Sequence, residues 1–319
     1  MADFFKEHNA HQIRFYSSGE PTQAMDVIEQ MVAFGRDLVG ERLITEIQTN
    51  GYFSEEIAKW LGENISIIWL SIDGWPEVND QYRPARDNPK PTDQILSNLR
   101  IMQERTFVGV RATVVPETVR RQAELIEYFA SLGVKQIYSE PVFEPVRISG
   151  EMQDRGKITL VNIMDYAYGF LEGWNRAQQL GVFYGNSFMV NFDEEVHVCC
   201  RSCIPAPHLT TDGYVSACDL GYYGNTALQD LIYGKWDPDG KRIIYFPEKI
   251  MKLRSRNTET MARLGCRNCE VLAHCSGGCM GRAYHETGDM FGVVSDYCLL
   301  TKFLWEHLPR GIKIEHLHP

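Results

Sequence analysis

The first half of the chain alternates between short apolar segments and longer segments whose apolar residues recur at helical spacing. The short segments favour β-structure, and we expect strands at 13–18, 43–49, 65–72, 107–115 and 134–142. The segment ISIIWLSI (65–72) is almost continuously apolar, which is typical of a strand buried on both faces. Repeated units of strand followed by helix or loop predict a parallel sheet, either open or rolled into a barrel.

Helices are expected between these strands, at 24–40, 54–62, 92–105 and 118–132. In the second of them, Ser54 is suited to cap the N-terminus, because its hydroxyl can accept a bond from a free backbone N–H. Glu55 and Glu56 follow in the first turn, where negative charge interacts favourably with the helix dipole.

A change in composition divides the chain. A charged, loop-like segment at 143–157 follows the last of these strands, and a long amphipathic helix is expected at about 159–180. All nine cysteines come later, between 199 and 298. We therefore predict an α/β region at 1–150, a helical bridge at 151–195 and a cysteine-rich module at 196–319.

Polar residues and glycines follow every expected strand. The five ends read Ser18-Gly19-Glu20-Pro21, Thr49-Asn50-Gly51, Ser71-Ile72-Asp73-Gly74, Arg111-Ala112-Thr113 and Ser139-Glu140-Pro141. Any single end is explained by turn chemistry alone. Because ligands bind at the carboxyl ends of the strands in parallel α/β folds, the recurrence of polar ends favours a binding site there.

Bulk composition narrows the classes of function. The net charge of −10 argues against a general nucleic-acid binder, which usually presents a basic surface. No run of about 18 apolar residues predicts a transmembrane helix. The N-terminal residues MADFFKEHNAHQIRF lack the apolar core of a signal peptide. We therefore expect a cytoplasmic protein with neither nucleic-acid nor membrane partners.

The cysteines are grouped in a way that suits metal binding rather than disulfides in a cytoplasmic chain. They are Cys199, Cys200, Cys203, Cys218, Cys266, Cys269, Cys275, Cys279 and Cys298. Short spacings supply two or three ligands and a distant residue completes the site, as Cys298 would for the C-x2-C-x5-C group. Eight thiolates suit two iron–sulfur clusters as well as zinc sites, and spacing does not separate these metals.

The complete cysteine pattern resembles the SPASM domain, the auxiliary-cluster module of certain radical SAM enzymes such as the anaerobic sulfatase-maturating enzymes. Nine residues separate Cys203 from Gly213, which lies in a hairpin-like turn, and four more precede Cys218. The group C-x2-C-x5-C-x3-C then spans 266–279, and Cys298 is the last cysteine. All seven of these cysteines have the spacing of the family.

The strand ends carry the same resemblance. SSGEP (17–21) is similar to the Gly-Gly-Glu-Pro segment that holds the methionyl amine of S-adenosylmethionine, and TNG (49–51) and SIDG (71–74) resemble the next two strand ends of the radical SAM barrel. The resemblance extends from about residue 12 to 305. It implies an α/β fold, with a partial (β/α) barrel of parallel strands followed by a small cysteine-rich module.

The resemblance also implies two auxiliary [4Fe–4S] clusters. One would be bound by Cys266, Cys269, Cys275 and Cys298. The other would be bound by Cys203, Cys218, Cys279 and either Cys200, which we assign, or its neighbour Cys199. In this family pattern Cys279 leaves its sequence neighbours and serves the more distant cluster.

S-Adenosylmethionine is the second cofactor that the resemblance implies. The segment formed by Gly19, Glu20 and Pro21 would orient its amine. Ser71 and Asp73 would reach its carboxylate or ribose. Arg111 would pair with the carboxylate, or it would serve only the structure of the barrel.

Substrate chemistry and partners follow from the same resemblance. Asp219 directly follows Cys218, as does the aspartate considered the catalytic base in sulfatase-maturating members. A solvated loop aspartate fits the local sequence equally well. The implied partners are a peptide or protein substrate and a reductant such as flavodoxin or ferredoxin.

The cluster that generates the radical in this family is held by a C-x3-C-x2-C loop after the first barrel strand. The sequence contains no such motif, because the completing positions after its two C-x3-C pairs are Ala206 and Arg282. The chain therefore resembles a radical SAM enzyme without its first strand and cluster loop, and we expect no site for the catalytic cluster in this sequence.

Three functions remain open at this point. The first is a radical SAM/SPASM enzyme that oxidatively modifies a peptide or protein side chain. The second is a catalytically silent or truncated homologue that carries clusters or binds peptides. The third is a structural module stabilised by zinc.

Overall fold

The computed structural model describes residues 5, 9–16, 19–143 and 159–310. Ser18 and most of the predicted boundary loop at 143–157 lie outside the described residues. By their internal contacts the described residues form two units, one within 5–142 together with 168–185 and the other with residues 143, 159–167 and 186–310. The predicted boundaries at 150 and 195 stay a prediction.

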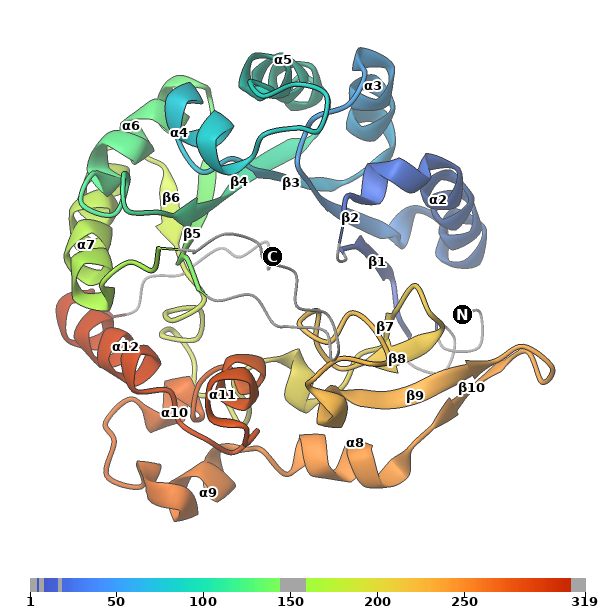
Figure 1. The fold of residues 1–319 in the computed structure, drawn as a ribbon, viewed down its shortest axis with the longest axis vertical. Coiled ribbons are helices and arrows are strands. Elements are labelled where there is room, and N and C mark those ends of the chain that lie inside the picture. Colours follow the sequence, from blue (N-terminus) through green and yellow to red (C-terminus); the bar gives the residue numbers. More distant parts are fainter. Residues whose placement is uncertain (1–4, 6–8, 17–18, 144–158, 311–319) are drawn as a thin grey trace. The chain divides into compact units, whose positions relative to one another are not determined.

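The first unit is built on a sheet in which, among the described residues, six parallel strands pair in the order of the sequence. They are β1 (Gln12–Phe15), β2 (Ile44–Thr49), β3 (Ile67–Ser71), β4 (Phe107–Val114), β5 (Gln136–Pro141) and β6 (Phe183–Gly185). Figure 1 shows this sheet curving, with the helices along its outer side. The predicted α/β fold with a parallel sheet is confirmed.

The helices of this unit follow the predicted alternation. They are α2 (Met25–Val39), α3 (Glu55–Asn64), α4 (Pro76–Tyr82), α5 (Thr92–Gln103), α6 (Gln122–Ser131) and α7 (Ile163–Leu180), with short 3-10 turns η1 (Pro21–Ala24) and η2 (Gly40–Arg42). Ser54 caps α3 as predicted, because its hydroxyl accepts a bond from the amide of Ile57. Helix α6 begins four residues later than predicted, since Thr118 bonds back to both the amide and the carbonyl of Val115 and forms a turn there.

Packing in the sheet depends on a glycine opposite a tryptophan. Trp69 on β3 is fully buried and pairs in register with Gly109 on β4. A Cβ atom at Gly109 would lie 2.7 Å from Cε3 of the Trp69 ring, so the absence of a side chain there makes room for the indole. The other side of the ring meets Tyr138 edge-on at a centroid distance of 5.4 Å.

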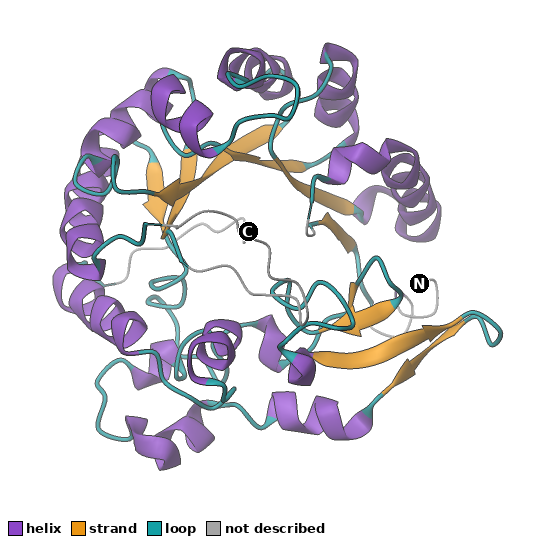
Figure 2. Cartoon of the chain, in the orientation of Figure 1, coloured by secondary structure: helices purple, strands orange, loops and turns teal. Residues whose placement is uncertain are grey.

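The second unit contains an antiparallel sheet of order β10-β9-β8-β7 in the described part of the chain. Its strands are β7 (His208–Leu209), β8 (Tyr214–Ser216), β9 (Ile232–Asp237) and β10 (Arg242–Tyr245) (Figure 2). The hairpin expected at Gly213 is present between β7 and β8. Gly213 has a φ of +83°, a conformation that glycine adopts without strain.

Short helices make up most of the rest of this unit. They are η3 (Arg201–Cys203), η4 (Gln229–Leu231), α8 (Pro247–Arg254), α9 (Thr258–Met261), the π-type turn η5 (Ala262–Cys266), α10 (Leu272–Cys275), α11 (Met280–Thr287) and α12 (Ser295–His307). Cys203 and Cys218 are buried in a core with apolar residues such as Leu231, Leu253 and Met280. Among the residues that the structure describes, no helix has both the length and the apolar character needed to span a bilayer.

Candidate functional site

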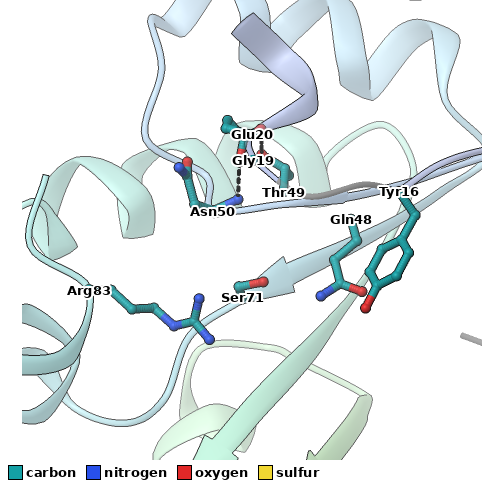
Figure 3. A pocket seen from close by; sticks show the side chains of 8 residues that line it. All are labelled: Tyr16, Gly19, Glu20, Gln48, Thr49, Asn50, Ser71 and Arg83. Atoms are coloured by element: carbon teal, nitrogen blue, oxygen red, sulfur yellow. Dashed lines mark hydrogen bonds between the residues drawn. The ribbon is translucent and has the colours of Figure 1, made fainter. Parts of the chain in front are cut away.

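A pocket of about 430 Å³ lies at the carboxyl ends of the first three strands. Its lining combines polar side chains from three strand ends with one arginine, and Figure 3 shows these residues as Tyr16, Gly19, Glu20, Gln48, Thr49, Asn50, Ser71 and Arg83. Three of the predicted site residues, Gly19, Glu20 and Ser71, therefore share one pocket. The position is the one expected of a ligand site in a parallel α/β fold.

Glu20 joins the loop after β1 to the end of β2. Its Oε1 accepts bonds from the amide and hydroxyl of Thr22 and from the hydroxyl of Thr49, the last at 2.6 Å. Among the described residues, its Oε2 accepts one bond, from the amide of Asn50 at 2.7 Å (Figure 3). Because a carboxylate oxygen can accept more than one bond, Oε2 retains capacity for a donor on a ligand.

The turn after β2 is held by contacts with the side chains of Leu70 and Asn98. Gly51 has a φ of +77°, and a Cβ atom there would collide with the side chain of Leu70. The amide group of Asn98 donates to the carbonyl of Gly51 at 2.9 Å. The TNG segment is therefore held in one conformation, with Thr49 and Asn50 on the pocket side.

Asp73 acts on the pocket through Arg83. The carboxylate is buried and accepts two bonds from the guanidinium of Arg83, at 2.6 Å to Nε and 2.9 Å to Nη2. The amide of Thr113 also donates to it, at 2.7 Å. A bidentate ion pair of this kind fixes the plane of the guanidinium, so Asp73 sets the orientation of Arg83, which lines the pocket.

Sequence reasoning missed three residues that line the pocket, Tyr16, Gln48 and Arg83, and the last of these carries a charge. Arg83 was the hardest of them to find. It follows α4, a seven-residue helix that the apolar pattern did not predict, in the segment NDQYRP. Pro21, Asp73 and Arg111, which were predicted, are not among the residues that line the pocket. Arg111 instead donates to the side chain of Gln48 at 2.9 Å, and Gln48 does line it.

A second cavity gathers four thiols. Its lining includes Cys266, Cys269, Cys275 and Cys298, together with Val271, Leu272, Gly277, Thr301 and Lys302. Three of these cysteines are close in sequence, whereas Cys298 comes from α12. Burial, with the neighbouring Cys298 thiol, raises the pKa of Cys275 to about 12, and burial also raises the pKa of Cys266 and Cys298.

Four further cysteines lie near one another in the same unit. A Cβ atom at Gly281 would be 3.3 Å from the sulfur of Cys218, so the chain just after Cys279 passes against that thiol. Burial and the nearby Cys200 thiol raise the pKa of Cys279 to about 11. Hydrogen bonds from Cys199 and Cys203 lower the pKa of Cys200.

The adjacent cysteines differ in their surroundings. Cys200 interacts with the thiols of Cys203, Cys218 and Cys279. Cys199 bonds to Cys200 and lies within electrostatic range of Cys275 and Cys279, one from each group of thiols.

Four thiols around one cavity are a donor set that both zinc and a [4Fe–4S] cluster use. In the part of the chain that the structure describes, no three His, Cys, Asp or Glu side chains converge closely enough to hold one metal ion. A [4Fe–4S] cluster binds its four cysteine thiolates on separate irons, so the four thiols fit its donor set.

Asp219 lies beside one of these thiols. The Cys218 thiol donates to its Oδ1 at 3.4 Å, and the aspartate side chain is partly exposed. A carboxylate in this position is accessible to a substrate and adjacent to a thiol of the second group.

Comparison with known proteins places the fold in a class. No protein-family model matches the chain. A cysteine-type anaerobic sulfatase-maturating enzyme of Clostridium novyi is 24% identical over 136 residues, which cover 41% of this chain and 36% of that protein. The radical SAM cyclopropyl synthase TigE of Paramaledivibacter caminithermalis is 23% identical, covering 93% of this chain and 60% of that protein. The chain thus spans less than two thirds of the length of these two relatives.

A third relative aligns over most of its length. The cysteine-type anaerobic sulfatase-maturating enzyme of Clostridium perfringens is 23% identical, covering 97% of this chain and 84% of that protein. Among solved structures, native anSMEcpe with bound AdoMet superposes with a TM-score of 0.73 at 18% identity, over 96% of this chain and 84% of that one. SuiB of Streptococcus suis bound to S-adenosylmethionine superposes with a TM-score of 0.59 at 16% sequence identity. The superposition covers 90% of this chain and 66% of that chain. The predicted resemblance to radical SAM enzymes and the partial-barrel fold are confirmed.

Proposed function

We propose that this protein is of the radical SAM/SPASM type, and that the intact enzyme of this type, which also needs the C-x3-C-x2-C loop that this sequence does not contain, oxidatively modifies a side chain of a peptide or protein. In this proposal it binds S-adenosylmethionine in the pocket at the strand ends and carries two auxiliary [4Fe–4S] clusters. The observation that supports it most strongly is the grouping of Cys298 with Cys266, Cys269 and Cys275 around one cavity, apart from Cys279. This division of the thiols is the one that the family resemblance implies.

The pocket suits the zwitterionic end of S-adenosylmethionine. The free capacity of Glu20 Oε2 favours the amine, whereas the guanidinium of Arg83 and the hydroxyl of Ser71 favour the carboxylate or ribose. Gly19 allows the backbone to approach the ligand closely, with a φ of +98°. In radical SAM chemistry this cofactor supplies a 5′-deoxyadenosyl radical, and the residues named here bind and orient it.

The two thiol groups suit two clusters. Cys266, Cys269, Cys275 and Cys298 would bind one, and Cys200, Cys203, Cys218 and Cys279 the other. We assign Cys200 rather than Cys199 because Cys200 interacts with all three other members of its group. Buried thiols ionise with difficulty unless a cation compensates the charge, and iron bound at each group would supply it.

The substrate class rests on the relatives and on Asp219. One solved relative is described as native anSMEcpe with bound AdoMet and the Kp18Cys peptide. The partly exposed carboxylate of Asp219, next to Cys218, is suited to take a proton from a substrate. A cluster held by Cys218 would supply an electron acceptor beside it. A flavodoxin- or ferredoxin-type protein would serve as the reductant.

Metal analysis tests the proposal. After anaerobic reconstitution with iron and sulfide, we expect about eight irons and about eight acid-labile sulfides per chain. Copurification of one or two zinc ions per chain, with no uptake of iron and sulfide, would contradict the cluster assignment and favour a zinc-stabilised module.

A further inference from the structure

Arg256, in the segment between α8 and α9, is fully buried within the cysteine-bearing unit. Its Nη2 donates to the carbonyls of Gly277 at 2.6 Å and Gly278 at 3.2 Å. Its Nη1 lies 3.1 Å from the sulfur of Met261, and its Nε has no hydrogen-bond partner in the described residues. The guanidinium is therefore held by neutral groups.

A buried positive charge requires compensation. Isolated ionised groups are strongly disfavoured in a protein interior unless they are paired, and an arginine does not lose its proton there. Among the residues that the structure describes, no aspartate or glutamate forms an ion pair with Arg256. The negative charge that balances it must come from another source.

The groups around Arg256 belong to the cysteine sites. Ser276, Gly277 and Gly278 all have positive φ, at 48°, 83° and 75°, which carries the chain from Cys275 to Cys279 around the guanidinium. Gly277 also lines the cavity of the four thiols. The arginine thus bonds directly to the loop that connects a ligand of one proposed cluster to a ligand of the other.

The loop bonded to Arg256 connects the two groups of thiols. At its start, Cys275 lines the cavity of the first group together with Gly277. Just after its end at Cys279, a Cβ atom at Gly281 would lie 3.3 Å from the sulfur of Cys218 in the second group. One fixed cation is therefore bonded to the segment that both groups share.

We propose that Arg256 is the shared counter-charge of the two auxiliary clusters and that it sets their reduction potentials while holding the Gly277-Gly278 loop in place. This inference rests on the proposed function. A [4Fe–4S] cluster with four thiolates is anionic and becomes more so on one-electron reduction, so a nearby cation favours the reduced form and raises the midpoint potential.

Two substitutions separate the charge from the hydrogen bonds. Arg256→Gln removes the charge but keeps an amide donor for the glycine carbonyls, whereas Arg256→Lys keeps the charge and loses the planar donor arrangement. Arg263→Gln is the matched control, because the side chain of Arg263 is 76% exposed and pairs with Glu259 at the surface. All are reconstituted anaerobically, and iron content and midpoint potentials are measured, the latter by a dithionite titration monitored by EPR.

We expect Arg256→Gln to show midpoint potentials more negative than those of the wild type, or a lower iron content, and Arg256→Lys to remain closer to the wild type on the same measure. The control should match the wild type. Full iron content with unchanged potentials in Arg256→Gln overturns the inference, and so do equal changes in the Gln and Lys variants. A wild-type chain that takes up no iron contradicts the proposed function instead.

Discussion

Both carboxylate oxygens of Glu20 are engaged at the strand ends, where the side chain links the loop after β1 to the end of β2. The same carboxylate is the proposed partner of the cofactor amine. Its effect on binding is therefore expected to be partly direct and partly through the positions of Thr49 and Asn50.

Replacing Glu20 tests this role. In Glu20→Gln the amide cannot accept bonds at both positions, so we expect S-adenosylmethionine affinity to fall by about tenfold, the equivalent of about 1.4 kcal/mol. Isothermal titration calorimetry under anaerobic conditions measures the change. Glu29→Gln, on the exposed face of α2, removes the same charge away from the pocket and should leave the affinity unchanged. Equal affinity of both variants would show that Glu20 has no part in binding.

At the scale of single residues, the sequence predicted the pocket residues that directly follow apolar strands. Glu20 and Ser71 could be found because strand ends of a parallel sheet meet at one edge. Arg83 could not, because it follows a short helix, and its place in the pocket depends on the two bonds that it donates to Asp73. Spacing alone also left the division of the thiols open, since Cys298 reaches its partners only through the packing of α12.

At the scale of elements, the sheet depends on close contact between neighbouring strands. Strands β2 to β5 were predictable because their apolar runs are long enough to be distinguished from loops. Strand β6 has three residues and helix α4 has seven, and neither carries enough periodic positions to be recognised. The strand depends on tertiary pairing with β5, and the helix depends on the bond that the amide of Asp73 donates to the side-chain oxygen of Asn79 in α4.

The contact between Gly109 and Trp69 gives a prediction for stability. In Gly109→Ala the new methyl group overlaps the indole, and we expect a loss of about 1–3 kcal/mol in the free energy of unfolding, as is usual for overpacking. Urea denaturation of the cluster-free protein measures it.

The double variant Gly109→Ala/Trp69→Phe is the control. Replacing Trp69 by phenylalanine removes no hydrogen bond, because the indole nitrogen has no partner in the described residues. Gly109→Ala should therefore lower the free energy of unfolding by less when residue 69 is phenylalanine than when it is tryptophan. Purely additive effects of the two substitutions would show that the predicted overlap does not occur.

For the molecule as a whole, the two units carry different parts of the proposed chemistry. The sheet unit provides a polar pocket, which we propose takes a small zwitterionic ligand. The other unit provides four thiols around one cavity, the further thiols that we propose form a second group, and the buried guanidinium of Arg256. The radical-generating C-x3-C-x2-C motif does not occur in this sequence. Cluster binding can therefore be tested on this chain independently of catalysis.

The central claim is that Cys275 and Cys279, though only four positions apart, belong to different clusters. The most direct test compares the iron content of two double variants after anaerobic reconstitution. Cys275→Ala/Cys298→Ala removes two ligands from one proposed cluster, so about four irons per chain should remain. Cys275→Ala/Cys279→Ala removes one ligand from each, so iron should fall well below about four. If the second variant instead retains about four irons and the first loses nearly all of its iron, the four thiols from Cys266 to Cys279 form one site, and the account is contradicted.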